Sequence, residues 1–308
     1  MTNTQNPAPL DCIENFNLSS QRSNIELEVD TFLNKNFQAR TGRPAKLSFN
    51  KLLFCLNLKR KYTCETWLGF YKLLKDRLEF QSGIDGVNTE MYLNLPSYAN
   101  FLKSIKRLIF YLFRLIYYQI ELNRETFLNQ EVRIAFVDST PLPVCKVIRS
   151  SRHKTMKEFA EYSKSTTGWY YGFKLHLTVD FNTKQVIDFQ FSNSKLDDRK
   201  YLENSMKTKF LNSETMFVAD KGYQARWLEE LAKDTGNYLL TGKKKSKHMR
   251  ILASQFDIYL LHIRARIESV FSDLKQNCFL TNTRSRSVLG YLFNYISSLY
   301  FLVFKSQK

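Results

Sequence analysis

The chain has 308 residues, 44% of them hydrophobic and 15% aromatic, so it can bury a sizeable core and is not a disordered protein. It carries 46 Lys and Arg against 29 Asp and Glu, a formal net charge of +17. Such a charge attracts polyanions at long range and favours nucleic acid as the partner. Charge alone leaves open a basic enzyme, a ribosome-associated protein or one that binds anionic membranes.

Cysteine usage and hydropathy exclude several other classes. The five cysteines are widely spaced and form no CxxC pair, which argues against a structural zinc and fits a reducing compartment. The first residues show no basic segment followed by an apolar core, so we expect no secretory signal and a cytoplasmic protein. Two apolar runs, 108–120 and 288–304, are too short or too polar for membrane spans, and we expect buried helices and no membrane partner.

The N-terminal part of the chain is predicted to be helical. Residues 1–20 are polar and contain two prolines, which is typical of a flexible arm. From 21 to 130 the apolar residues recur at helical spacing, and this range is predicted to be a separate helical domain. Its last helix, beginning after Ser97, is apolar on nearly every side and should be buried.

Two short helices within this region are candidates for a DNA-binding motif. One includes Leu52 and Leu56, the next includes Trp67 and Leu74, and a basic link around Arg60 joins them. This pattern is typical of a helix-turn-helix and equally of an ordinary helical bundle. Both interpretations stay open at this point.

Residues 131–308 are predicted to form an α/β domain with a mixed sheet flanked by helices, preceded by the all-helical region. Strands rich in β-branched and aromatic residues alternate with turn residues and helical patterns, and Asp180 to Thr183 predict an antiparallel hairpin. A basic loop, 242–250, and a long amphipathic helix follow. The predicted strands cover 132–137, 169–179, 186–191, 216–219 and 238–241, and the predicted helices begin near 199 and 225 and span 258–276.

Two acidic residues end apolar strands. Asp138 follows the run IAFV, and Asp220 follows the run MFVA. Each carboxylate alone is better explained as a turn or helix-capping residue. Because ligands of α/β sheets gather where buried strands end, two such residues in one basic domain indicate a site.

A third candidate lies on the long amphipathic helix. At about 100° per residue, Arg264, Glu268 and Lys275 form one row beside its apolar stripe. An exposed ion pair between Arg264 and Glu268 explains this row without any function. The functional alternative is a third carboxylate ligand flanked by two cations that contact DNA phosphates.

Three carboxylates from separate elements suit metal-dependent phosphodiester chemistry. Two Mg²⁺ ions about 4 Å apart offset charge on the scissile phosphate and activate water or a 3′-hydroxyl. Mn²⁺ is expected to substitute, because it prefers the same oxygen ligands. The predicted catalytic and metal-binding set is therefore Asp138, Asp220 and Glu268.

Seven segments of the chain form a specific combination of motifs. They are TGRPAKLS (41–48), LPSYANF (95–101), FVDSTPL (136–142), STTGWYYGFKLHL (165–177), DDRK (197–200), FVADKGY (217–223) and RARIESVFSDLK (264–275). Together they resemble DDE-type transposases of bacterial insertion sequences, and within these the group known as insertion sequence nine-eight-two. The combination of the DST and ADKGY motifs is the most specific feature, and with the two N-terminal segments the resemblance covers nearly the whole chain after residue 20.

The resemblance implies an RNase H-like catalytic domain whose acidic residues occupy the places of Asp138, Asp220 and Glu268. It also implies binding to double-stranded DNA, both terminal inverted repeats and target, by a homodimer or higher oligomer, with cleavage and strand transfer as the reaction. The sequence departs from the wider superfamily at one position, since Leu261 stands where a Tyr is common.

Other conspicuous residues receive less specific predictions. His176 lies in the middle of a strand and is expected to be a packed histidine rather than a ligand. Asp197 and Asp198 are expected to cap the next helix. DNA contacts are predicted for Arg264 and Lys275, and for the two basic loops through Arg152, Lys154, Lys243, Lys244, Lys245 and Lys247.

Two other functions share these features. A nuclease of the same fold would cut without joining, since the metal chemistry is common to both. A DNA-binding repressor or inactive transposase would keep the basic surface alone, although mere binding does not require the three carboxylates. An assay that separates cleavage, joining and binding distinguishes the three.

Overall fold

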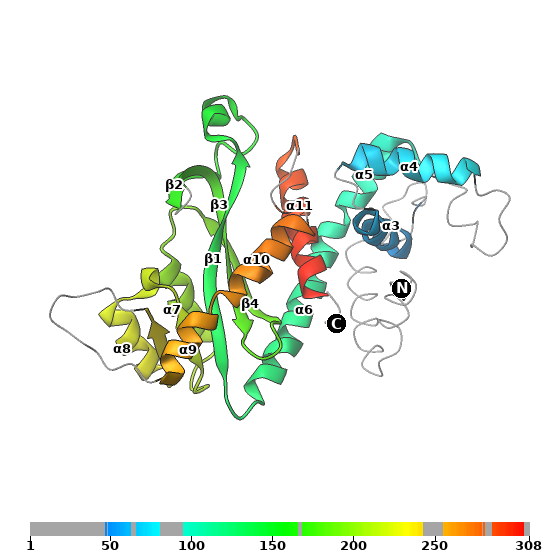
Figure 1. The fold of residues 1–308 in the computed structure, drawn as a ribbon. Helices are drawn as coiled ribbons and strands as arrows, with labels where there is room; N and C mark the ends of the chain where they lie inside the picture. The colour runs from blue at the N-terminus through cyan, green and yellow to red at the C-terminus, as the bar shows by residue number, and fades with distance from the viewer. Residues whose placement is uncertain are drawn as a thin grey trace, which may run out of the picture. The chain divides into compact units, whose positions relative to one another are not determined.

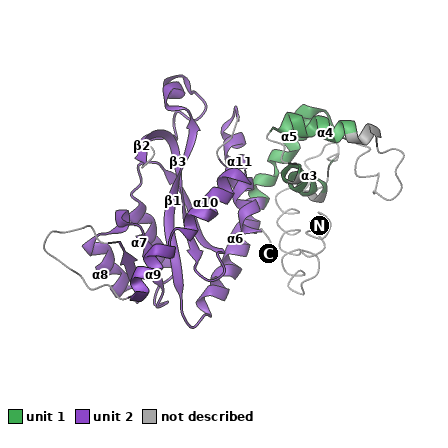
Figure 2. Cartoon of the chain, in the orientation of Figure 1, with its two compact units in different colours: residues 1–111 green, residues 112–308 purple. Residues whose placement is uncertain are grey.

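The computed structural model describes residues 47, 49–62, 66–80, 95–165, 168–242, 255–278, 280 and 285–304. The chain divides into two compact units, residues 1–111 and 112–308 (Figure 2). The sequence predicts a domain boundary at residue 131, whereas this division falls inside helix α6 (Leu108–Leu128). The reason is packing: Phe113 and Tyr117 of α6 place their rings against Phe189 of the sheet.

Unit 1 contains α3 (Phe49–Lys61), α4 (Trp67–Phe80) and α5 (Tyr98–Lys106) (Figure 1). Aromatic contacts join α4 to α5: the Tyr71 ring lies 5.3 Å from that of Tyr98 and 5.6 Å from that of Phe101. The predicted basic link is wrong, because Lys59 and Arg60 belong to the last turn of α3, where the helix dipole favours cations. The helix-turn-helix stays a prediction.

Unit 2 is built on one mixed sheet. Its elements after α6 are β1 (Ile134–Cys145), η2 (Val147–Arg152), β2 (Glu161–Ser165), β3 (Gly168–Asp180), β4 (Val186–Asn193), α7 (Asp198–Thr208), β5 (Met216–Ala219), η3 (Lys221–Tyr223), α8 (Arg226–Asp234), β6 (Tyr238–Thr241), α9 (Gln255–Ile263), α10 (Arg266–Gln276) and α11 (Val288–Val303).

The strand order is that of an RNase H-like fold. β1 pairs antiparallel with β3, and β3 with β4, whereas β1 pairs parallel with β5 and β5 with β6. The short strand β2 pairs with the start of β3. The predicted fold class, a mixed α/β sheet flanked by helices after a helical N-terminal region, is confirmed.

Helices cover both faces of this sheet (Figure 1). Alternate residues of β1 point to opposite faces, so Ala135 and Val137 enter one core while Phe136 faces the other way. Helices α7 and α8 cover the first face; α9 packs on β5 and β6, and α10 on β1. The first core joins Ala135, Val137, Ile187, Phe217 and Ala219 to Tyr201, Leu202, Met206, Phe210, Leu228 and Ala232.

The strand β1 runs further than the sequence predicts, to Cys145. Pro141 and Pro143 argue against a strand, since proline cannot donate a ladder hydrogen bond. They are tolerated because the pairing of β1 with β5 ends at Val137 and Ala219, so beyond that point β1 is paired on the β3 side. The predicted hairpin is confirmed: the Asp180 carboxylate accepts hydrogen bonds from the backbone N–H groups of Asn182 and Thr183.

The long amphipathic helix predicted over 258–276 is two helices. α9 ends at Ile263 and α10 begins at Arg266. At the step between them the backbone N–H of Ile267 bonds the carbonyl of Arg264, three residues back instead of four, and Glu268 bonds Ala265 in the same way. This tighter turn changes the direction in which Arg264 and Glu268 point relative to each other.

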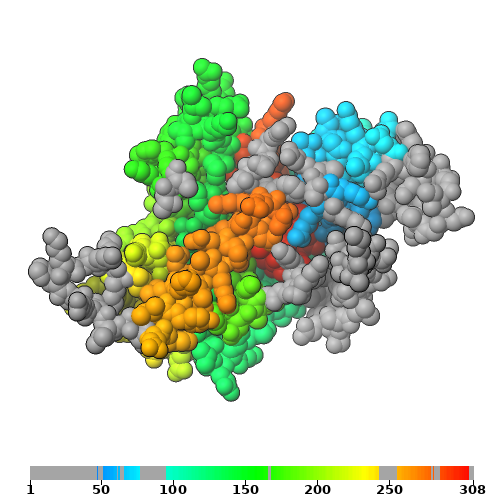
Figure 3. Space-filling view, viewed as in Figure 1, coloured from blue at the N-terminus to red at the C-terminus, as the bar shows by residue number. Residues whose placement is uncertain are grey.

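In the space-filling view α9 and α10 form one continuous ridge across unit 2 (Figure 3). Leu260 and Ile267 beneath this ridge are 0% exposed, and burial of each stabilises the fold by about 1.5–3 kcal/mol. The last helix, α11, is largely buried, as its apolar sequence predicts. Among the helices in the described residues, none is long and apolar enough to cross a membrane.

We predict that Gly172→Ala is strongly destabilising. Gly172 pairs with Pro143 where the register of β1 and β3 shifts, and an added Cβ would lie 2.0 Å from the Leu142 carbonyl oxygen. The backbone would have to move, at a cost of about 2–3 kcal/mol or more. Urea denaturation measures this, with Gly222→Ala as the control because its Cβ would meet nothing within 4 Å. Equal stability of both variants would contradict the prediction.

Candidate active site

Two aspartates lie side by side where the parallel pairing of β1 with β5 ends. Asp220 follows the last residue of β5, as predicted, whereas Asp138 does not end its strand, because β1 continues to Cys145 on the β3 side. Val137 and Ala219 are paired residues of β1 and β5. Asp138 and Asp220 are the residues that follow this pair, so the parallel register brings their backbones side by side at one edge of the sheet. The strand pairing that the sequence could only suggest therefore places both predicted carboxylates together.

One guanidinium joins these two carboxylates. Arg264, in the step between α9 and α10, places Nη1 3.4 Å from Oδ2 of Asp138 and Nη2 3.8 Å from Oδ1 of Asp220. The Arg264 side chain is 18% exposed and that of Asp138 23%, so water screens this contact only partly. Arg264 was predicted to contact DNA; in the protein by itself it is the counter-charge of the aspartate pair.

The buried position of Asp138 changes its acidity. The pKa of Asp138 is raised from 3.8 to about 6; burial is the largest cause, and the nearby carboxylates of Asp220 and Asp198 act in the same direction. A hydrogen bond from the backbone N–H of Ser139 and the charge of Arg264 act in the opposite direction. Burial therefore destabilises the ionised carboxylate more than its hydrogen bond and the Arg264 charge stabilise it. An added cation beside Asp138 would favour the ionised form.

The other two residues of the predicted helix row differ in their surroundings. Lys275 of α10 is half-buried, and burial lowers its pKa while the Asp138 carboxylate raises it, so its ammonium lies near the aspartate pair. Glu268 is exposed in the first turn of α10. In the described part of the chain Arg264 pairs with the two aspartates and not with Glu268, so the simple surface ion pair is not formed.

Comparison with known proteins identifies the domain that carries this site. A family model described as "Transposase DDE domain" matches residues 128–288, which include both aspartates, Arg264, Glu268 and Lys275. The chain belongs to the DDE transposase family. The narrower group, insertion sequence nine-eight-two, stays a prediction. No curated protein matches the chain.

Solved structures of two transposases resemble this DDE transposase chain. The first is a piggyBac transposase synaptic complex with hairpin DNA, at 11% identity and a TM-score of 0.47, covering 96% of this chain and 74% of that one. The second is a Mos1 transposase paired-end complex, at 12% identity and a TM-score of 0.28, covering 86% and 78%. These values are too low to add to the family assignment.

The aspartate pair of the transposase domain has the donors that Mg²⁺ and Mn²⁺ prefer, hard carboxylate oxygens. Asp138 and Asp220 fit such an ion, since they approach from two strands and already hold a cation, the Arg264 guanidinium, between them. Glu268 is not brought to them. Within the described residues there is no group of three or more His, Cys, Asp or Glu that could hold a metal ion, so Glu268 as the third ligand stays a prediction.

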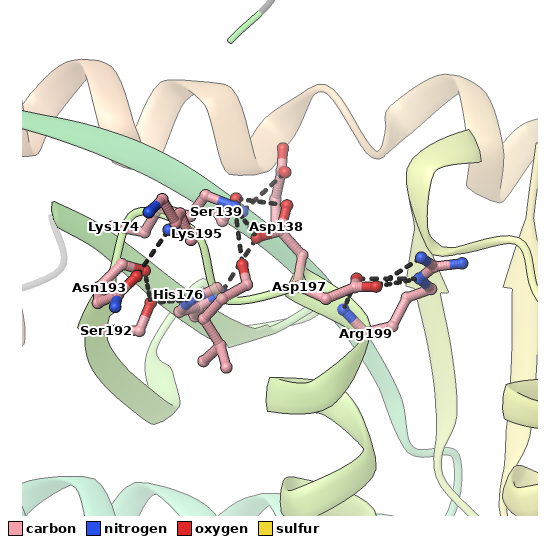
Figure 4. A network of polar contacts seen from close by, with 11 residues as sticks. Asp138, Ser139, Lys174, His176, Ser192, Asn193, Lys195, Asp197 and Arg199 are labelled. Atoms are coloured by element: carbon pink, nitrogen blue, oxygen red, sulfur yellow. Dashed lines mark hydrogen bonds and ion pairs between the residues drawn. The ribbon is translucent and has the colours of Figure 1, made fainter. Parts of the chain in front are cut away.

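A polar network behind Asp138 was not predicted from the sequence of this transposase (Figure 4). Ser139 and Lys174 both contact the carboxylate of Asp198, the first residue of α7. The expected cap is formed by Asp197, which accepts a hydrogen bond from the backbone N–H of Arg199. Asp198 therefore has another role than capping. The segment DDRK carries two adjacent acids, and a helix needs only one of them as its cap. The second acid was the signal in the sequence that Asp198 has a different role.

His176 is the packed histidine that the sequence predicts. It is 0% exposed, its ring stacks on Tyr201 at 5.0 Å, and its Nε2 lies 2.7 Å from Oγ of Ser192. Burial lowers its pKa to about 4, so the imidazole is neutral at physiological pH.

Of the six basic loop residues predicted to contact DNA in this transposase, two lie within the described residues. Arg152, at the end of η2, and Lys154 are exposed on the segment between β1 and β2. Lys243, Lys244, Lys245 and Lys247 lie outside the described residues. All six DNA contacts stay predictions. Arg152 and Lys154 are exposed, so their substitution can be tested by DNA binding.

The burial of Asp138 predicts a pH-dependent stability. Because the pKa of Asp138 is higher in the folded protein, the folded protein binds a proton at this carboxylate more tightly than the unfolded chain does. Its stabilising contribution is complete below about pH 4 and is lost as the pH rises through 6. Asp138→Asn should therefore raise the free energy of unfolding by about 1–3 kcal/mol near pH 7.5, and change it little near pH 4.

Urea denaturation across this pH range in the presence of a chelator measures the difference. Asp220→Asn is the control, because its carboxylate is 54% exposed and its removal relieves less desolvation. A stability difference between wild type and Asp138→Asn that is the same at both pH values would contradict the assigned burial effect.

Proposed function

We propose that this chain binds the ends of its own mobile element and catalyses Mg²⁺-dependent DNA cleavage and strand transfer. The observation that carries the proposal is the convergence of Asp138 and Asp220 on one guanidinium, inside the matched transposase domain. Mn²⁺ is proposed to substitute for Mg²⁺. The DNA substrates are proposed to be the terminal inverted repeats and then the target.

The proposed metal ligands are Asp138 and Asp220, with Glu268 as the third. When bound, the divalent ions would offset charge on the scissile phosphate and make water or a 3′-hydroxyl nucleophilic near neutral pH. The carboxylates supply the negative charge that holds such ions. The raised pKa of Asp138 supports this role, because a cation is the partner that favours its ionised form.

Arg264 and Lys275 are proposed to act on the DNA. Arg264 partly offsets the charge of the two aspartates in the free protein, and its planar guanidinium is suited to a phosphate group. The Lys275 ammonium, held near Asp138 and partly desolvated, attracts the same backbone. Both cations thus hold the phosphate beside the carboxylates rather than taking part in bond cleavage.

The remaining parts of the proposal concern assembly and place. Two DNA ends must be cut and joined together, so we propose a homodimer or higher oligomer on DNA. A cytoplasmic, nucleoid-associated protein follows from that function. A nuclease that cuts without joining shares the same acidic site, and measurement of joined products separates it from a transposase.

Charge removal at Asp220 should abolish catalysis without abolishing binding. With a DNA duplex that carries the element end, Asp220→Asn should lower the Mg²⁺-dependent cleavage rate at least about 100-fold, while end binding is retained. Asp234→Asn, an exposed acid-to-amide change on α8, is the matched control and should cleave normally. Full cleavage by wild type in excess chelator would exclude the metal mechanism.

Glu268→Gln tests the third ligand in the same assay. If Glu268 completes the site, this variant should lose cleavage and joining as Asp220→Asn does and still bind end DNA. Lys275→Ala should instead weaken or misplace end binding, since it leaves every carboxylate in place. Normal cleavage by Glu268→Gln would show that another acidic residue completes the site.

The exposed pair Arg152 and Lys154 is proposed to contact DNA phosphates. The double change to Ala should lower the slope of log affinity against log salt by up to about 0.9 for each lost contact. A matched double change, Arg226→Ala with Lys233→Ala on α8, removes the same charge from exposed positions and should leave the slope unchanged. Equal slopes for both variants would mean that general charge, not a contact, is responsible.

A further inference from the structure

The carboxylate of Asp198 links three elements of the catalytic unit. Its Oδ1 accepts a hydrogen bond from Nζ of Lys174 on β3 at 2.9 Å, and its Oδ2 accepts one from Oγ of Ser139 on β1 at 3.0 Å. Asp198 itself begins α7. Hydrogen bonds to an ionised group are about twice as strong as neutral ones, so this carboxylate holds the three elements firmly together.

Ser139 connects this link to the candidate metal site. Successive residues of a strand point to opposite faces, so the Asp138 carboxylate lies on the α10 side and the Ser139 hydroxyl on the α7 side. The backbone N–H of Ser139 donates to Oδ1 of Asp138 at 2.8 Å, while its hydroxyl donates to Asp198. One residue thus holds both carboxylates, one through its backbone and one through its side chain.

The strand needs such support at this point. The pairing of β1 with β5 ends at Val137, one residue before Asp138. From Asp138 onward the ladder on the β3 side continues, with Asp138 opposite Leu177 and Ser139 opposite His176. The bond from Ser139 to Asp198 anchors β1 to α7 where the pairing with β5 has stopped.

The surroundings of Asp198 leave its carboxylate little freedom. Lys174 is 16% exposed and also donates to the carbonyl of Leu196 at 3.0 Å, which fixes its ammonium. Nδ1 of the fully buried His176 lies 3.7 Å from Oδ1 of Asp198. Lys174 and His176 lie beside Ser139, whereas the neighbouring acid Asp197 points away toward Arg199 (Figure 4).

We propose that Asp198 is a positioning residue that, through Ser139, holds the carboxylate of Asp138 in the orientation that binds the divalent ion. This role rests on the proposed function. It predicts that the Ser139 hydroxyl, and not merely a small side chain at this position, determines metal affinity. It also predicts that the two adjacent acids of α7 have different functions.

Ser139→Thr and Ser139→Val form a matched pair for the experiment, because they have the same shape and only Thr keeps the hydroxyl. Asp198→Asn removes the charge that accepts the bond. Asp197→Asn is the control, since it removes the charge that pairs with Arg199 and keeps a side-chain oxygen that can cap the helix. Mn²⁺ binding to the full chain without DNA is measured by the loss of the electron paramagnetic resonance signal of free Mn²⁺, and unfolding temperature is measured in parallel.

We expect Ser139→Thr to bind Mn²⁺ as wild type does, and Ser139→Val and Asp198→Asn each to bind it about 10- to 100-fold more weakly with unchanged stoichiometry. The double variant should be no weaker than either single one, because both changes break one link. Asp197→Asn should leave Mn²⁺ affinity unchanged and change the unfolding temperature little, because Asn caps a helix as well as Asp does and the pair with Arg199 is partly exposed.

Equal Mn²⁺ affinity of the Thr and Val variants would overturn the positioning role. So would the loss of one bound ion from Asp198→Asn, which would make Asp198 a ligand itself. Failure of wild type to bind any Mn²⁺ would instead refute the proposed function. Wild-type binding with all variants alike refutes the positioning role alone.

Discussion

The parallel pairing of β1 with β5 is the constraint on which the candidate site depends. It sets Val137 beside Ala219, so the next residue of each strand, Asp138 and Asp220, emerges at the same edge of the sheet. Two like charges held close together repel each other, and the Asp220 carboxylate accordingly disfavours ionisation of Asp138. The guanidinium of Arg264, which lies near both carboxylates, reduces that repulsion.

The fold supplies counter-charges on both faces of β1. On the α10 side Arg264 and Lys275 approach Asp138; on the α7 side Lys174 pairs with Asp198. The compensation is incomplete, since the pKa of Asp138 stays raised to about 6. A site that remains short of positive charge in the free protein is suited to bind a divalent cation, at some expense of stability.

Sequence patterns predict this fold well where burial and turn chemistry coincide. Asp138 and Asp220 each follow a buried apolar run, and the turn at Asp180 carries its own hydrogen-bonding side chain, so these strands and this turn are predictable, although the continuation of β1 past Asp138 is not. The break between α9 and α10 at Arg264 and Ala265 contains no Gly or Pro from which it could be predicted. It depends on how the two helices pack. The bonds of Asp198 to Ser139 and Lys174 join residues far apart in the chain, which no local pattern reveals.

The proposed metal site requires that Asp138 and Asp220 together hold the catalytic ion in the place where the Arg264 guanidinium lies in the free protein. A crystal of the chain bound to element-end DNA in Mn²⁺, with diffraction recorded at the Mn absorption edge, tests it most directly. The account predicts an anomalous peak in contact with both carboxylates and the Arg264 guanidinium moved from them to a DNA phosphate. Mn²⁺ peaks elsewhere, with Arg264 still paired to both aspartates, would contradict it.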